Sequence, residues 1–286
     1  MSNSLLQPII DECGLNITHY EAVGGGDINR CYCLFGTQKK YFLKVNNAFS
    51  YPKMFEQEAI GLNALRNNCK LFVPEVIRYG LVYEQQYLLL EWIVAGTPAA
   101  NFWQDFGAEL ALLHQLPQDY FGWKEHNYIG SLVQKNAIYP SWNSFYPECR
   151  IMPLVKKLFD TGVFTKQDVV AAELFCKQVE QLFPQEPPAL LHGDLWGGNC
   201  MVAANGSVAF FDPAVYYGHR EMDIGMTKLF GGFDPGFYHA YNEVYPLENN
   251  WQQRLPFTQL YPVLVHALLF DGHYVQTARS IIRSLQ

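Results

Sequence analysis

A predicted β-hairpin over residues 200–212 constrains the fold of this chain more than any other feature. Two short apolar runs, residues 200–203 and 208–211, flank the pair Asn205-Gly206. An Asn-Gly pair between two such runs is a strong signal for a hairpin. The two ends of a hairpin lie side by side, so polar residues just before it and just after it are expected to come together.

Three polar residues bracket this predicted hairpin. Asp194 and Asn199 lie five positions apart in a glycine-rich loop before it, and Asp212 follows it directly. The order acid, amide, hairpin and acid is typical of kinases, in which the first acid accepts the proton of the acceptor hydroxyl and the other two bind magnesium at the ATP phosphates. Taken singly, each residue could instead serve a turn or a helix cap. Together they predict Asp194 as the base and Asn199 and Asp212 as Mg²⁺ ligands.

A lysine and a glutamate in the N-terminal part support this prediction. Lys44 lies in the apolar run 41–45, which predicts a strand, and Glu58 lies near the apolar stripe of a helix predicted over 53–68. An unpaired carboxylate close to a buried face is costly, so Lys44 is its expected partner. In kinases such a pair positions the α- and β-phosphates of ATP. The alternative is that Lys44 points to solvent and Glu58 lies at the edge of the stripe.

Further candidates for ATP binding depend on their place along the chain. They are Gly24, Gly25, Gly26, Asn29, Arg30, Glu91 and Ile93. The glycines lie between the first two predicted strands, where backbone amides can approach phosphates, although three glycines can serve any tight turn. The last two residues lead out of the predicted sheet, and we expect their backbone groups to bond the adenine.

The predicted secondary structure changes from strands to helices along the chain. Strands predicted at 76–79 and 87–93 complete a small antiparallel sheet, whereas after Gly96-Thr97-Pro98 the apolar residues recur at helical spacing. The first of these later helices ends near His114, which is expected to pack or to cap the helix. We therefore predict an α+β, two-lobed, protein-kinase-like fold. Its expected parts are an N-terminal lobe over 1–95 and a larger, mainly helical C-terminal lobe over 96–286.

Composition and charge exclude several classes of protein. The chain of 286 residues is 49% hydrophobic and 16% charged, which predicts a substantial core. No apolar run reaches the roughly 20 residues of a membrane helix, and the N-terminus is unlike a secretory signal. The formal net charge of −7 gives no general reason to bind nucleic acid, and the seven cysteines lack the paired spacing of a zinc site. We expect a cytoplasmic monomer with reduced thiols and no nucleic-acid or membrane partner.

The motifs resemble those of one family. The run 190–199, with the sequence LLHGDLWGGN, followed by the run 211–214 and by Tyr217-Gly218-His219, is similar to the fructosamine kinase family. The resemblance implies transfer of the ATP γ-phosphate to the 3-hydroxyl of a ketosamine, the product of a sugar and an amine, in a deglycation reaction. The implied cofactors are ATP and Mg²⁺, and the implied partners are small ketosamines or glycated protein lysines.

The same resemblance implies a role for one further acid, because Asp223 resembles the acid that braces the catalytic loop in this superfamily. Three acceptor contacts are instead inferred from chain proximity alone. Trp196, beside the predicted base, is a candidate to pack on the sugar skeleton, and Tyr217 and His219, just beyond Asp212, are candidates to bond its hydroxyls, although packing roles are an alternative. The chain departs from many eukaryotic members at Asp27, where they carry cysteine, so a redox switch at that position is not implied.

Several alternatives remain open at this point. The nearest is another small-molecule kinase of the same superfamily, acting on an aminoglycoside, choline or a simple sugar. Trp196 and the run Tyr217-Gly218-His219 disfavour it. A nucleotide-binding module without catalytic activity is a second alternative. The sequence does not decide whether the acceptor is a fructosamine, a ribulosamine or an erythrulosamine.

Overall fold

A computed structural model describes residues 3–24 and 28–285 of the chain. Gly25 and Gly26 of the predicted phosphate loop, and the neighbouring Asp27, lie outside the described residues. The chain divides into two compact units, Met1–Phe102 with Met201–Asp212, and Trp103–Cys200 with Pro213–Gln286. The division between residues 95 and 96 stays a prediction.

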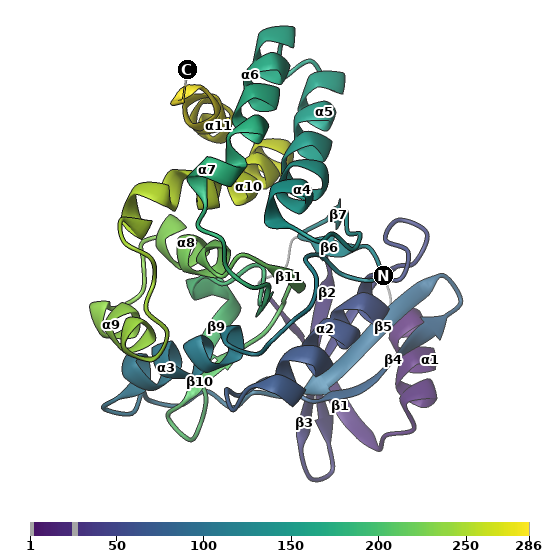
Figure 1. Cartoon of the computed structure of the whole chain (residues 1–286). Helices are drawn as coiled ribbons and strands as arrows, with labels where there is room; N and C mark the ends of the chain where they lie inside the picture. The colour runs from purple at the N-terminus through teal and green to yellow at the C-terminus, as the bar shows by residue number, and fades with distance from the viewer. Residues whose placement is uncertain (1–2, 25–27, 286) are drawn as a thin grey trace. The chain divides into compact units, whose positions relative to one another are not determined.

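The first unit is built on a five-stranded antiparallel sheet (Figure 1). Its strands are β1 (Ile17–Val23), β2 (Arg30–Gly36), β3 (Lys40–Asn47), β4 (Val76–Val82) and β5 (Gln85–Glu91), in the order β1-β2-β3-β5-β4. The strands predicted at 76–79 and 87–93 are confirmed as β4 and β5. The region after the glycines holds two strands, β2 and β3, where the apolar pattern at 41–45 alone indicated one.

Two helices pack on opposite faces of this sheet. The helix α1 (Asn3–Cys13), which the sequence analysis did not anticipate and which contains Pro8, places Ile9 in a buried cluster with Leu43 and Leu89. The helix α2 (Met54–Asn68) lies against β4 and β5 and confirms the helix predicted there. Because strand side chains alternate between faces, the residues on either side of Leu43 point toward α2.

The predicted hairpin is present and belongs to the first unit from Met201 onward. Its strands are β9 (Cys200–Val202) and β10 (Val208–Phe210). The Gly206 N–H donates to the Ala203 carbonyl at 2.8 Å, and Gly206 has a φ of 81°. Glycine adopts this left-handed conformation at no steric cost, which explains why it follows asparagine in the turn.

The second unit is mainly helical, as expected, and the α+β class is confirmed. Its helices are α3 (Phe102–His114), α4 (Trp142–Phe145), the π-helix η1 (Tyr146–Ile151), α5 (Met152–Asp160), α6 (Lys166–Lys177), α7 (Val179–Leu182), the 3-10 helix η2 (Gly197–Asn199), α8 (Glu221–Leu229), α9 (Pro235–Val244), α10 (Trp251–Phe270) and α11 (His273–Arg283). Two short antiparallel pairs complete it: β6 (Asn127–Ile129) with β7 (Leu132–Gln134), and β8 (Ala189–Leu191) with β11 (Tyr216–Gly218).

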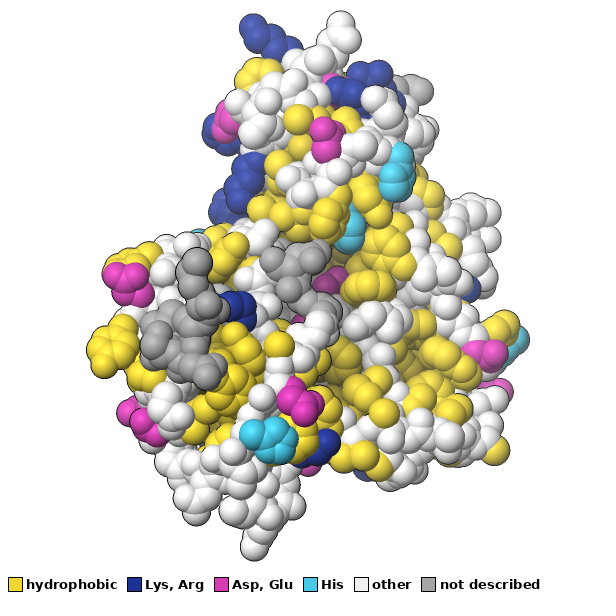
Figure 2. Space-filling model, turned by 180° about the vertical axis from the view of Figure 1, so that it is seen from behind, with side chains coloured by type: hydrophobic (Ala, Val, Ile, Leu, Met, Phe, Trp, Pro, Cys, Tyr) yellow, Lys and Arg dark blue, Asp and Glu magenta, His cyan; other side chains and the backbone are white. Residues whose placement is uncertain are grey.

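The end of α3 agrees with the expectation for His114. His114 ends α3, is buried, and its Nδ1 lies 2.8 Å from the Tyr241 hydroxyl, so it is a packed residue. Basic side chains gather over α5, α6 and α11 (Figure 2). Two of them, Arg279 and Arg283, form ion pairs with the buried Asp168, so part of this charge is compensated.

Among the described residues, no helix has the combined length and apolar character needed to cross a membrane.

Candidate active site

Lys44 is enclosed between two carboxylates in the first unit. It lies on β3, is 3% exposed, and its Nζ donates to Glu58 Oε1 at 2.7 Å and to Asp212 Oδ1 at 2.5 Å. The predicted pairing of Lys44 with Glu58 is therefore present. Burial lowers the pKa of Lys44, but the carboxylates of Asp212 and Glu58 outweigh burial and raise this pKa above its usual value. The ammonium stays charged at every physiological pH.

Asp212 ends the first unit with an uncommon backbone conformation. Its φ is 55°, in the left-handed region that residues other than glycine seldom adopt. Such a conformation costs on the order of 1–3 kcal/mol and is concentrated at functional sites. The side chain is 45% exposed although one oxygen bonds Lys44. The carboxylate therefore keeps accessible surface with which it can bind a cation.

The loop of residues 192–199, here called the Asp194 loop, is braced by Asp223 in the second unit. Asp223 lies in the first turn of α8 and is 1% exposed. Its two oxygens accept the backbone N–H groups of His192 at 2.8 Å and of Gly193 at 2.9 Å. Buried hydrogen bonds to a charged group are among the stronger ones in proteins. Asp223 thus fixes the two residues that precede Asp194.

Gly193 is the point at which a second segment docks on the Asp194 loop. The Ala214 N–H donates to the His192 carbonyl at 2.9 Å. Gly193 has a φ of 82°, and a Cβ atom built on it would lie 2.1 Å from the Ala214 carbonyl oxygen. Only glycine fits there, because any side chain would collide with the backbone and would disfavour the positive φ.

Asn199 holds Asp194 through both hydrogens of its side-chain amide. Its Nδ2 donates to the Asp194 backbone carbonyl at 2.9 Å and to the carboxylate oxygen Oδ2 at 2.9 Å. Asn199 is 8% exposed, so this arrangement is sheltered. The amide oxygen Oδ1 is left to accept or to bind a metal ion. The predicted acid and amide are therefore in direct contact.

The amide oxygen of Asn199 in the second unit and the carboxylate of Asp212 in the first unit are each oxygen donors of the kind that magnesium binds. Magnesium prefers oxygen ligands and usually keeps water and phosphate oxygens beside one or two protein carboxylates. Over residues 3–24 and 28–285, no group of three or more His, Cys, Asp or Glu side chains is arranged to hold a metal ion alone. A magnesium ion held by one or two protein oxygens completes its coordination with water and phosphate oxygens.

A buried amide pair that the sequence analysis missed holds the segment docked on the Asp194 loop. Gln134 is 1% exposed, and its Nε2 donates to the Ala214 carbonyl at 2.9 Å. Asn127 is 4% exposed, and its Nδ2 donates to the Val215 carbonyl at 2.9 Å. Tyr261 donates to Gln134 Oε1 at 2.9 Å, which fixes the amide orientation. Isolated Asn and Gln residues in a short polar stretch give no sequence signal for such a role.

Arg150 extends this network from the π-helix η1. It is fully buried, and its guanidinium donates to the Lys135 carbonyl at 2.6 Å and to Asn136 Oδ1 at 2.9 Å. Its Cζ also lies 3.9 Å from the centre of the Tyr216 ring. Asn136 in turn donates to Asn127 Oδ1 at 2.7 Å. A buried cation is thus compensated by carbonyl oxygens and an aromatic face.

The other residues predicted to contact the nucleotide lie in the first unit, and each of those described has its own surroundings there. Asn29 Oδ1 accepts from Asn46 at 2.7 Å, and Arg30 donates to Gln85 at 2.5 Å. Gly24 is exposed just after β1. Glu91 is the last residue of β5, its N–H donates to the Glu75 carbonyl at 2.9 Å, and Ile93 is half-buried just beyond. Their contact with adenine and phosphate stays a prediction.

The three acceptor candidates differ in their accessibility. Trp196 is half-buried, packs edge-on against Phe230 with ring centres 5.2 Å apart, and lies over Gly198. Tyr217 is half-buried, and its ring centre lies 5.1 Å from that of Trp123. These two residues keep exposed surface.

His219 has a packing role instead of the expected contact with a substrate hydroxyl. It is 0% exposed, its Nδ1 accepts from the Glu221 N–H, and its Nε2 lies 3.2 Å from the Pro184 carbonyl. Both ring nitrogens are therefore occupied within the second unit. Burial lowers the pKa of His219, so the ring is neutral at pH 7.

Known proteins are similar to this chain in sequence and in fold. A family model described as fructosamine kinase matches residues 1–286. A protein of Synechocystis named probable ketoamine kinase is 38% identical over 273 residues, covering 93% of this chain and 90% of its own. A chloroplastic protein-ribulosamine 3-kinase of Oryza sativa is 33% identical over 275 residues, covering 93% of this chain and 78% of its own.

Solved structures give the same result at the level of the fold. The crystal structure of a Thermobifida fusca protein assigned as a fructosamine-3-kinase superposes with a TM-score of 0.88 at 31% identity, covering 99% of both chains. An aminoglycoside phosphotransferase in complex with ADP and hygromycin B gives a TM-score of 0.64 at 15% identity, again over 99% of both chains, which shows a shared fold. The full-length family match and these relatives establish that the chain belongs to the fructosamine kinase family.

Proposed function

We propose that this protein transfers the γ-phosphate of ATP to the 3-hydroxyl of ketosamines. Membership of the family and the names of the relatives, probable ketoamine kinase and protein-ribulosamine 3-kinase, support this activity. The observation that carries the proposal for this chain is the contact of Asn199 with both the carbonyl and the carboxylate of Asp194. That contact presents one carboxylate in a fixed direction, as a general base requires.

Asp194 is the proposed base. A sugar-derived acceptor carries several hydroxyls, and the one that reacts must lie within hydrogen-bond reach of the carboxylate and in line with the γ-phosphate. Asn199 fixes Oδ2, and Asp223 fixes the backbone just before the base. Positioning of the base is therefore completed by the fold before any substrate arrives.

Lys44 is proposed to bind a phosphate oxygen of ATP. A lysine ammonium has three donors, and Glu58 and Asp212 accept two of them. The third donor remains for a phosphate, while the hydrogen bond to Glu58 holds the ammonium on the α2 side of the sheet. Asn199 and Asp212 would hold magnesium, whose bound charge neutralises the phosphates.

An acceptor panel with product analysis tests the proposed function. The purified chain is incubated with ATP, magnesium and the fructosamine, ribulosamine and erythrulosamine adducts of lysine, with an aminoglycoside and choline as rivals. We expect the ketosamines to be phosphorylated on the third sugar carbon, as located by phosphorus NMR. The smaller two acceptors are expected to give higher kcat/KM. Phosphate at another carbon, or transfer to an aminoglycoside but to no ketosamine, would overturn the proposal.

The cellular compartment, the acceptor class and the oligomeric state are part of the same proposal. All seven cysteines are free thiols, which supports a reducing compartment such as the cytoplasm. Glycated lysines of proteins are a second acceptor class beside free ketosamines, because both present the same sugar. We expect the protein to act as a monomer, which size-exclusion chromatography with light scattering measures directly.

A further inference from the structure

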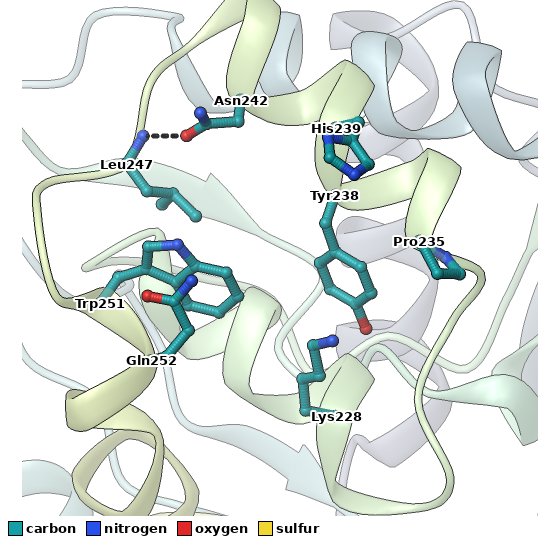
Figure 3. A pocket seen from close by; sticks show the side chains of 8 residues that line it. All are labelled: Lys228, Pro235, Tyr238, His239, Asn242, Leu247, Trp251 and Gln252. Carbon is teal, nitrogen blue, oxygen red and sulfur yellow. Dashed lines mark hydrogen bonds between the residues drawn. The ribbon is translucent and has the colours of Figure 1, made fainter.

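A cavity of about 330 Å³ lies in the second unit, between the end of α8, the helix α9 and the start of α10 (Figure 3). Its lining is Lys228, Pro235, Tyr238, His239, Asn242, Leu247, Trp251 and Gln252, and we call it the Lys228 cavity. Tyr238, Leu247 and Trp251 give it apolar walls. A volume of this size can hold a small organic molecule.

Lys228 differs from two shielded arginines of the second unit in having no carboxylate partner among the described residues. The buried Arg220 forms an ion pair with Glu186 at 2.7 Å, and Arg254 forms one with Glu221 at 2.5 Å. Over the part of the chain that the structure describes, no carboxylate lies within ion-pair distance of the half-buried Lys228. Its Nζ lies 3.6 Å from the centre of the Tyr238 ring, which only partly replaces a counter-ion.

The physical consequence is a cation that lacks a counter-charge at the wall of a cavity. Burial lowers the pKa of Lys228, and no neighbouring carboxylate offsets this effect. Removing a charge from water without a partner is unfavourable, so an anion that enters the cavity would gain a desolvated ion pair.

The remaining lining favours the same kind of ligand. In a chain with 27 acidic and 20 basic residues, the lining contains no Asp or Glu. Asn242 Oδ1 already accepts from the Leu247 N–H at 2.8 Å, which leaves its Nδ2 to donate. The Tyr238 and Trp251 rings are inclined by only 24° to each other, with centres 6.3 Å apart. Aromatic walls of this kind suit a flat apolar body.

We propose that the Lys228 cavity binds a small organic anion, with its carboxylate on Lys228 and a flat apolar body against Tyr238 and Trp251. This inference does not depend on the identity of the phosphoryl acceptor. The helix α8 carries both Lys228 and Asp223, the residue that braces the Asp194 loop. They are five positions apart, which is about 7.5 Å along a helix axis.

A matched pair of ligands tests the proposal on the unmodified full chain. Indole-3-acetate and its neutral amide, indole-3-acetamide, have the same shape and differ in charge. Their binding is followed by NMR shifts of the Trp251 indole N–H, assigned with the variant Trp251→Leu. We expect the acid to bind with a Kd of about 1 mM or tighter, as ligand efficiency suggests for this size. We expect the amide to bind at least tenfold more weakly.

A lysine variant then tests whether Lys228 supplies the charge that the acid binds. Lys228→Met keeps most of the aliphatic chain and is expected to weaken the binding of indole-3-acetate at least tenfold, to the affinity of the amide. Lys177→Met removes an exposed lysine of α6 and is expected to leave both affinities unchanged. Equal binding of acid and amide to the unmodified chain, or unchanged acid binding to a folded Lys228→Met variant, would overturn the proposal. Because the acid and amide comparison needs no variant, a failure of Lys228→Met to fold would not affect it.

Discussion

Asn199 donates to the backbone carbonyl and to the carboxylate of Asp194 at the same distance, 2.9 Å. A single amide therefore fixes both the chain and the side chain of the proposed base. The oxygen of the same amide is the proposed magnesium ligand. The proposed base and the proposed metal ligand are therefore joined by two hydrogen bonds from one amide group.

The close approach of Gly193 to Ala214 predicts a position-specific effect of one methyl group. Gly193→Ala places a Cβ atom 2.1 Å from a carbonyl oxygen at a positive φ, so the Asp194 loop must move. We expect the free energy of unfolding to fall by more than about 1 kcal/mol and kcat to fall with it. Gly197→Ala in the same loop meets no atom within 4 Å and is the matched control. Equal effects of the two variants, measured by urea unfolding and initial rates, would contradict this account.

The buried amide of Gln134 is expected to position the Asp194 loop through Ala214. Gln134→Met keeps the shape but leaves the Ala214 carbonyl and the Tyr261 hydroxyl without this partner. We expect a loss of about 1–3 kcal/mol in stability, and a fall in kcat with little change in the KM for ATP. The control is Thr258→Val, which removes a buried hydroxyl bonded to the Leu255 carbonyl. If both variants lose stability and both keep kcat, Gln134 only packs.

Lys44 and Glu58 are expected to act as one unit. In a double-mutant cycle of Lys44→Met and Glu58→Gln, the effects on kcat/KM for ATP should fall short of additivity by about 0.5–3 kcal/mol. The exposed pair Lys156 and Asp160, whose charged atoms lie 2.6 Å apart, serves as a control and should show no coupling in kcat/KM. Strict additivity at Lys44 and Glu58 would mean that their contact has no part in catalysis.

His219 predicts how stability depends on pH. Its pKa is lowered by burial in the folded state, whereas in the unfolded chain it is about 6.5. Below about pH 6.5 the unfolded chain therefore takes up a proton that the folded chain resists, and the free energy of unfolding falls. Urea unfolding at pH 8 and pH 5.5 should show a smaller pH effect in His219→Gln than in the unmodified protein. The exposed His239, changed to Gln, should leave the pH effect intact, and an unchanged effect in His219→Gln would refute the explanation.

Local patterns predicted the parts of this structure whose signals lie close together in sequence. The hairpin followed from Asn205-Gly206, and the pairing of Lys44 with Glu58 followed from a strand charge and a helix stripe. The hairpin depends on neighbouring residues, and the Lys44–Glu58 pair joins two successive elements only 14 positions apart, so both signals are short-range. The family resemblance followed from the same short motifs.

Other features could not be predicted because they depend on contacts between distant segments. The contact of Gln134 with Ala214 joins residues 80 positions apart, and no periodicity marks either of them. His219 lies seven residues after Asp212, and this proximity along the chain suggested a place at the acceptor. The structure instead encloses it against Pro184, which is 35 positions away. The helix α1 was missed because Pro8 interrupts its pattern, although the apolar residues around it pack on the sheet.

The role of Asp194 is the central claim, and the variant Asp194→Asn tests it most directly. Asparagine keeps the size of the side chain and an oxygen that can still accept from Asn199, but it cannot take up the proton of the acceptor hydroxyl. The measurement is a single-turnover transfer from ATP to a ribulosamine adduct of lysine, together with ATP affinity from equilibrium binding. The account predicts that transfer slows by about 100-fold or more while ATP affinity stays within about threefold. Transfer at a near-normal rate by the folded variant would contradict it.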